Sequence, residues 1–135
     1  MSVSLRSVVI ESQDPVALGA FWSAALESSI DPGMGGVNIR FGRNQELLLY
    51  IVEGSGEKNR KVEPFMHLAA ETSTLDEEAA RLMNLGAVTL KRQWNVHTDL
   101  NVGWIIMSDP EGNCFQLLSS DEEVAAAERM LESWE

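Results

Sequence analysis

The residues that could do chemistry in this chain lie mostly in pairs sixty positions apart. His67 and Glu71 in the second half match Ser7 and Glu11 in the first half. An imidazole is a good ligand for a divalent metal, whereas a serine hydroxyl is a poor one. The two carboxylates could share acid–base work, but they lie four residues beyond Ser7 and His67, near the expected strand ends where water solvates them. A histidine in such a position is more often a satisfied core or cleft residue than a metal ligand, and His67 is open to that interpretation.

The remaining candidates are one histidine, one cysteine and three tryptophans. His97 lies in a polar stretch that predicts a loop, and Trp94 and Trp104 flank this stretch. Flat indole rings beside a cleft are common ligand platforms, because they bury a large area and stack on planar groups. Trp22 belongs to an apolar helical stripe and is expected in the core. Cys114 has no histidine near it in the sequence to activate its thiol, so we expect an ordinary buried or half-buried cysteine.

The elements that must position these residues repeat as well. The segment 7–12 leads into one helix-like run and the segment 67–72 leads into another, and apolar extended segments follow each run. When the two halves are overlaid, Glu11 falls on Glu71 and Ala20 falls on Ala80. Two similar strand–helix–strand units in one short chain predict a duplicated fold, with a cleft between or across the halves.

The first half has clear helix and turn signals. Asp14 is a typical N-cap and Pro15 suits the first helical position. A proline and three glycines between residues 31 and 36 predict a loop. The expected elements are a strand at 5–11, a helix at 15–26, and two hairpin strands at 37–41 and 46–52.

The second half follows the same order after a polar, glycine-bearing linker at 54–62. Alternation places His67, Ala69 and Glu71 on one face of a strand. Thr74 and Glu77 form a capping box, and Gly86 ends the helix. The expected elements are strands at 65–71, 87–91, 104–108 and 114–118, helices at 75–85 and 121–134, and a turn at 109–113.

Composition limits the function classes. The chain has 135 residues, 44% of them hydrophobic and 23% charged, which is typical of one globular domain. Its net charge of −11 disfavours nucleic acid and anionic membranes as partners, and favours neutral or cationic ligands. A single cysteine excludes an internal disulfide. The sequence shows neither a secretory signal nor an apolar run of membrane-spanning length, so a cytoplasmic location is expected.

The order of several motifs carries a family resemblance. Asp-Pro at 14–15 precedes Phe-Trp at 21–22, a Met-His-Leu strand at 66–68, a Leu-Gly-Ala helix end at 85–87 and an Asp-Pro-Glu-Gly-Asn turn at 109–113. This order resembles the glyoxalase/bleomycin-resistance/dioxygenase (vicinal oxygen chelate) superfamily, and more narrowly the small glyoxalase-like domain proteins. The resemblance implies an α+β fold of two tandem βαβββ modules, at about 5–53 and 63–119, that form a curved mixed sheet around a cleft, with a C-terminal helix added.

The resemblance also implies where a metal would bind. In enzyme members of the superfamily, ligands to a divalent metal come from the first and last strands of each module. The matching positions here are Ser7, Tyr50, His67 and Gln116. A metal site needs about three firm ligands, and this set offers one imidazole. We therefore expect neither a metal nor another cofactor.

Two classes of function follow from the resemblance. One is a metal-free protein that binds a small organic ligand, like the antibiotic-sequestering members, which commonly form the cleft across a homodimer. The other is a lyase, isomerase or dioxygenase with a degenerate metal site, or with a metal-independent acid–base pair of His67 and Glu71. A cleft for a common metabolite is a third possibility. We predict the binding protein, with no assigned catalytic residue. Its expected ligand-binding residues are Ser7, Tyr50, His67, Glu71, Trp94, Trp104 and Gln116.

Overall fold

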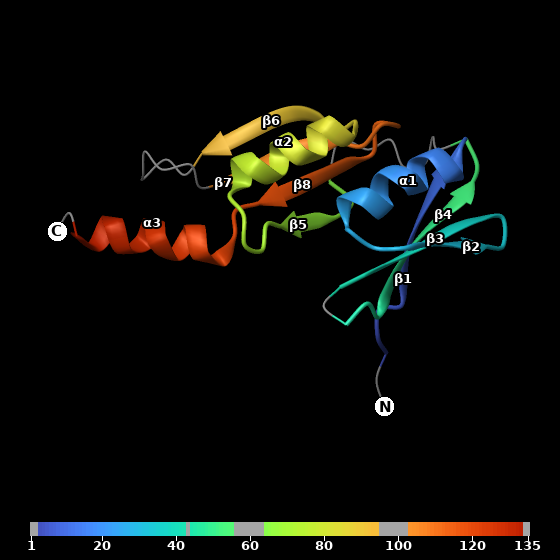
Figure 1. Cartoon of the computed structure of the whole chain (residues 1–135), viewed down its shortest axis with the longest axis horizontal. Coiled ribbons are helices and arrows are strands. Elements are labelled where there is room, and N and C mark those ends of the chain that lie inside the picture. The colour runs from blue at the N-terminus through green and yellow to red at the C-terminus, as the bar shows by residue number, and fades with distance from the viewer. Residues whose placement is uncertain (1–2, 43, 56–63, 95–102, 134–135) are drawn as a thin grey trace. The chain divides into compact units, whose positions relative to one another are not determined.

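The computed structural model describes residues 3–42, 44–55, 64–94 and 103–133 (Figure 1). The chain divides into two compact units, residues 1–61 and 62–135. Each unit contains a strand, a helix and three further strands, and its four strands form one mixed sheet. A third helix ends the second unit. The predicted α+β fold of two βαβββ modules with a C-terminal helix is therefore confirmed. The expected linker at 54–62 lies mostly outside the described residues.

The sheet of the first unit has the strand order β1-β4-β3-β2. β1 and β4 pair in parallel, and the other pairs are antiparallel. A parallel pair needs a crossover connection, and α1 supplies the helical part of it. The elements are β1 (Ser7–Ser12), α1 (Pro15–Ala25), β2 (Ile30–Gly33), β3 (Gly36–Phe41) and β4 (Leu47–Glu53).

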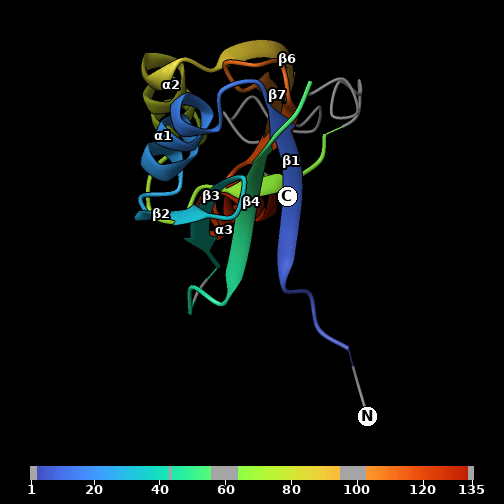
Figure 2. The same ribbon diagram turned by 90° about the vertical axis from the view of Figure 1, so that its right-hand side faces the viewer.

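Helix α1 begins as predicted and covers one face of this sheet (Figure 2). The Asp14 carboxylate accepts a hydrogen bond from the Ala17 N–H at 3.1 Å. Trp22 is fully buried, so its expected place in the core is confirmed, and its ring meets that of Phe21 edge-to-face with centroids 5.1 Å apart. On the sheet side, Ile39 and Ile51 belong to the same core.

The segment 31–36 is not simply a loop, as the sequence had suggested. Residues Ile30–Gly33 form strand β2, which pairs with β3 through a tight turn at Gly35. Gly35 has φ of +72°, a conformation that glycine adopts without strain. Pro32 is tolerated because β2 is an edge strand, where the missing N–H does not interrupt hydrogen bonding between central strands.

The sheet of the second unit has the strand order β5-β8-β7-β6, again with one parallel pair, β5 and β8. Strand β5 is shorter than the predicted 65–71, and β6 extends beyond the predicted residue 91. The elements are β5 (His67–Ala69), α2 (Leu75–Leu85), β6 (Val88–Trp94), β7 (Gly103–Ser108), β8 (Cys114–Leu118) and α3 (Asp121–Ser133).

Helix α2 lies over one face of this sheet (Figure 1). The Thr74 hydroxyl caps it by accepting a hydrogen bond from the Glu77 N–H at 3.1 Å. Gly86, with φ of +122°, ends it as predicted. Leu75 and Leu82 are buried, but Leu85, which was expected in the same stripe, is 37% exposed because it lies in the last turn.

The turn and the helix that follow also form as predicted. Asp109 is buried and accepts hydrogen bonds from two backbone N–H groups, of Glu111 and Asn113, at 3.0 and 2.9 Å. Its second oxygen accepts one from the Asn113 side-chain amide at 2.8 Å. Ser120 caps α3 through the Glu123 N–H at 3.1 Å. None of the helices in the described ranges is long and apolar enough to cross a membrane.

Candidate ligand-binding site

Each sheet has one face covered by the helix of its own unit and a second face that holds the candidate residues. In the first unit, Ile10 and Ser12 on β1 are buried under α1, so the alternation of the strand places Ser7, Val9 and Glu11 on the other face. Tyr50 on β4 pairs with Val9 in the parallel register and therefore shares this face. We call it the open face of the first sheet.

Tyr50 is held by the β2–β3 hairpin. Its hydroxyl donates a hydrogen bond to the backbone carbonyl of Met34. Its ring lies over Gly33, where an added Cβ would come within 2.7 Å of Tyr50 Cε2. The phenol donor is thus already engaged within the protein, and only the oxygen lone pairs remain for a ligand. This contact could not be predicted from the sequence, because it joins a tyrosine to a hairpin that was expected to be a loop.

In the second unit, the strand register brings three predicted residues to one face. His67 on β5 pairs with Gln116 on β8, and Gln116 pairs with Ile106 on β7. Trp104, two residues along β7 from Ile106, is therefore on the same face, and its side chain is 40% exposed. The opposite face of this sheet carries the buried Ile105 beneath α2. We call the face with Trp104 the open face of the second sheet.

Two residues of this face were missed by the sequence analysis. Lys91 and Gln93 on β6 pair with Ile106 and Trp104 respectively. The register of β6 shifts between Thr89 and Lys91, where the strand has one extra residue. The bulge reverses the alternation along β6, and nothing in the sequence marks its position. A prediction from simple alternation along this strand therefore fails at Lys91.

Three further candidates of the second unit are not placed on this face by the described part of the chain. Glu71 was expected on the same strand face as His67, but β5 ends at Ala69 and Glu71 lies in a bend, exposed to solvent. Its expected strand alignment is therefore wrong. Trp94 is the last residue of β6, in register with Gly103, but its side chain is not described. His97 lies outside the described residues, so its loop position stays a prediction.

Comparison with known proteins identifies the family of this chain. The sequence matches the family model of the glyoxalase-like domain over residues 7–118. The chain belongs to the glyoxalase-like domain family. The matched range runs from the first residue of β1 to the last residue of β8, so it includes both modules. No curated protein matches the sequence.

Solved structures with the glyoxalase-like fold are similar over most of their length. FosX, a fosfomycin resistance protein from Listeria monocytogenes, has a TM-score of 0.70 and 18% identity, covering 91% of this chain and 98% of that chain. TnmS3, an antibiotic binding protein from Streptomyces sp. CB03234, has a TM-score of 0.62 and 18% identity, covering 87% and 97%. A glyoxalase/bleomycin resistance protein/dioxygenase family enzyme from Burkholderia phytofirmans PsJN has a TM-score of 0.63 and 16% identity, covering 85% and 97%. One FosX structure is a complex with Mn(II). At these identities the likeness shows the fold.

The donor chemistry of this glyoxalase-like domain does not fit a divalent metal. Of the four positions that the superfamily pattern assigns to ligands, only His67 is a strong donor to such an ion. Ser7 offers a neutral hydroxyl, Gln116 a neutral amide, and the Tyr50 phenol is engaged with Met34. Within the described ranges, no three His, Cys, Asp or Glu side chains are grouped so that they could hold a metal ion.

Cys114 is a poor nucleophile in this fold. Its side chain is only 3% exposed, and burial raises the pKa of the thiol because the charged thiolate would lose its hydration. The reactive form of a cysteine is the thiolate, so the raised pKa keeps Cys114 in its unreactive form at neutral pH. This is the ordinary buried thiol that the sequence predicted.

Proposed function

We propose that this glyoxalase-like domain is a metal-free protein that binds and sequesters a small organic ligand, of the kind represented by bulky natural products and antibiotics. The observation that carries the proposal is the open face of the second sheet. There, a large, partly exposed indole, Trp104, shares a surface with His67 and Gln116. Ligand sites typically combine such an apolar platform with a few oriented polar groups.

The polar groups on this face suit hydrogen bonding more than catalysis. An imidazole and a carboxamide can each donate and accept, and they lie in register on adjacent strands. The alternative acid–base pair of His67 and Glu71 required both residues on one strand face, but β5 ends before Glu71. The antibiotic-binding activity of TnmS3 supports a binding role for the same fold, whereas FosX with Mn(II) represents the metal-dependent alternative.

A thermal-shift screen of the purified chain tests the proposal. A ligand that binds only the folded state raises the unfolding temperature. The rise grows with the logarithm of the ligand concentration once that concentration exceeds the dissociation constant. We expect aromatic natural products to raise it with no metal added, and the Trp104→Ala variant to respond less. A rise only when a divalent metal is present, or turnover of a hemithioacetal or catechol with metal, would contradict the proposal.

We also propose that the protein acts as a homodimer in the cytoplasm. Val9, 56% exposed on the open face of the first sheet, is a large apolar side chain that a partner surface would bury. Light scattering at micromolar concentration is expected to give twice the mass of the chain. A strict monomer would remove the dimer and leave the binding proposal standing.

A further inference from the structure

We infer that the ligand is a planar aromatic carboxylate, with its ring stacked on Trp104 and its carboxylate paired with the Lys91 ammonium on the open face of the second sheet. The inference rests on the proposed binding function and names the class of ligand that this face would select. It replaces the preference for neutral or cationic ligands that the net charge of the whole chain had suggested.

The bulge in β6 determines on which face Lys91 lies. Residues three apart on a regular strand lie on opposite faces, yet Thr89 and Arg92 both meet α2. The Thr89 hydroxyl lies 3.4 Å from Met83 Sδ, and Arg92 forms an ion pair with Asp76. The extra residue between Thr89 and Lys91 resolves the conflict. Without it, Lys91 would fall on the helix side.

The spacing of Lys91 and Trp104 follows from the ladder of β6 and β7, and it is the spacing of their backbone positions. Lys91 pairs with Ile106, and Gln93 pairs with Trp104 on the same two strands. Lys91 and Trp104 are therefore diagonal neighbours on one face, about 7–8 Å apart. This separation suits a ligand that covers the indole with one ring system and carries its charged group at the ring edge, where the flexible lysine stem can reach it.

The charge of this face differs from that of the whole chain. The chain has 21 acidic and 10 basic residues, but in the described strands of the second unit the open face carries no carboxylate. By strand register its members are His67, Ala69, Val88, Lys91, Gln93, Trp104, Ile106, Ser108, Cys114, Gln116 and Leu118. Glu71 follows β5 at the opposite edge of the sheet from β6. An anionic group beside Lys91 therefore meets a cation without a competing carboxylate on the same face.

Three probes of one ring size test the inference on the full chain: 2-naphthoate, 2-naphthamide and 2-naphthylmethylammonium. Calorimetric titration is expected to give the tightest binding for naphthoate, about fivefold tighter than for the amide, and the weakest for the ammonium. The advantage of naphthoate over the amide should shrink at high salt, because screening weakens exposed ion pairs.

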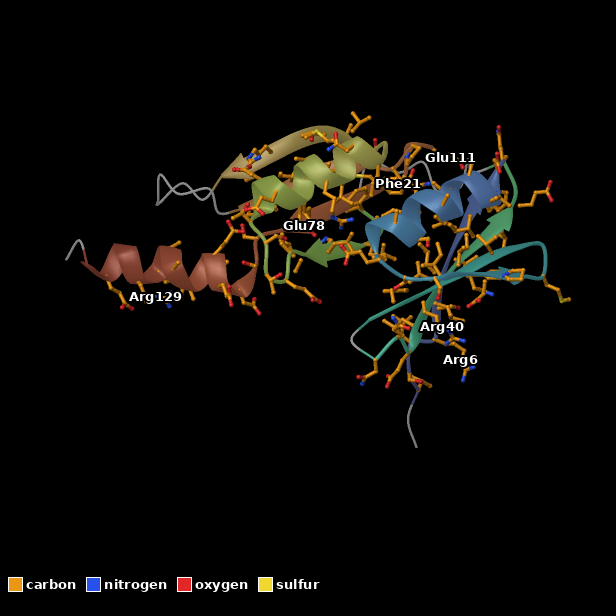
Figure 3. The ribbon with its side chains drawn as sticks, viewed as in Figure 1. Arg6, Phe21, Arg40, Glu78, Glu111 and Arg129 are labelled. Carbon is orange, nitrogen blue, oxygen red and sulfur yellow. The ribbon has the colours of Figure 1, made fainter. Side chains whose placement is uncertain are left out.

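Variants test the contact with Lys91 and the contact with Trp104 separately. Lys91→Gln should abolish the preference for naphthoate and leave the affinity for the amide unchanged. Arg129→Gln is the control, since Arg129 is an exposed cation of the same unit that lies on α3, outside the sheet (Figure 3). It should change neither affinity. Trp104→Ala should weaken the binding of naphthoate and of the amide alike.

Each contrary result has a distinct meaning. Equal binding of the three probes, a preference for the ammonium, or a carboxylate preference that survives Lys91→Gln would overturn the inference while Trp104-dependent binding still supported the proposed function. No binding of any probe, or binding that does not depend on Trp104, would overturn the inference, whereas the proposed function would fail only if the thermal-shift screen with natural products also found no ligand that depends on Trp104.

Discussion

The Glu123 carboxylate on α3 accepts a hydrogen bond from the backbone N–H of Leu75, the first residue of α2, at 2.7 Å. The first N–H groups of a helix have no partner within the helix, and a carboxylate there also interacts favourably with the helix dipole. The C-terminal helix of the second unit is therefore tied to the start of α2 by one side chain. This contact is the structural role that we assign to the beginning of α3.

Replacing Glu123 with alanine should lower the free energy of unfolding by about 1–2 kcal/mol, because the bond is made to a charged group but is only partly buried. Hydrogen exchange should also become faster at the amides of α3 and of the first turn of α2. Glu122→Ala is the matched control, because Glu122 lies in the same helical turn and is exposed. If both variants lose equal stability, the contact with Leu75 contributes nothing measurable.

Asp109→Ala should destabilise the protein by about 3 kcal/mol or more, because it leaves donors in the turn without their acceptor. The Asp109 side chain accepts from the Glu111 and Asn113 backbone and from the Asn113 amide. Asp31→Ala is the comparison. The Asp31 ion pair with Arg40 is exposed, at 4.0 Å, so its loss should cost under about 1 kcal/mol. Chemical denaturation of the two variants measures both values.

Asp109 and Asp31 also differ in how well their surroundings could be predicted from the sequence. The Asp-Pro-Glu-Gly-Asn turn, the Asp14 cap and the Gly86 helix end were predictable, because each depends on neighbours within a few residues. The edge strand β2 was not predicted, since its pairing with β3 overrides the loop composition of residues 31–36. Strand β6 was predicted as far as residue 91, but the face on which Lys91 lies was not predicted. Its bulge is a property of the ladder with β7, so the face that Lys91 occupies cannot be derived from alternation along one strand.

The candidate site also has features that could be predicted from the sequence and features that could not. The partnership of His67 with Gln116 followed from the resemblance, and the register of β5 and β8 places the two residues side by side. The engagement of Tyr50 with Met34 joins parts of the chain sixteen residues apart, through a backbone carbonyl that no side-chain pattern reveals. Predictions that depended on strand ends, such as the alignment of Glu71 with His67, failed because strand boundaries are decided by pairing.

Burial of Cys114 predicts a specific pH dependence. The folded thiol keeps its proton to a higher pH than the unfolded thiol, whose pKa is about 8.5. The stabilising contribution of the neutral thiol is complete below that pH and is lost as the pH rises toward the raised folded pKa, because the unfolded state then binds fewer protons. Unfolding free energy measured from pH 7 to 10 should therefore fall less steeply in Cys114→Ala than in the parent protein. Parallel curves would contradict the effect.

Purified protein should contain no stoichiometric zinc, iron, manganese or nickel. The reason is chemical: the four positions of the superfamily pattern are Ser7, Tyr50, His67 and Gln116, which supply one strong ligand. Elemental analysis after expression in metal-supplemented medium provides the measurement, and dialysis against a chelator should leave the unfolding temperature unchanged. A stoichiometric metal that is lost on His67→Ala would mean that ligands outside this set complete the site.

The roles of Trp104 and His67 separate binding from catalysis. For a ligand that fills the surface around the indole, Trp104→Ala should weaken binding by tenfold or more, since truncating a buried aromatic anchor costs on the order of 2 kcal/mol. His67→Ala should weaken it less, because the imidazole supplies at most one or two hydrogen bonds, and it should leave the fold intact, since His67 is exposed. Val16→Ala, an exposed apolar change on α1, is the control for unspecific effects.

An enzyme would show the reverse order: His67→Ala would abolish turnover, and Trp104→Ala would mainly raise KM. Calorimetry with one confirmed ligand, together with a turnover assay on the same ligand, distinguishes the two orders. An unchanged affinity in Trp104→Ala would place the ligand away from the open face of the second sheet.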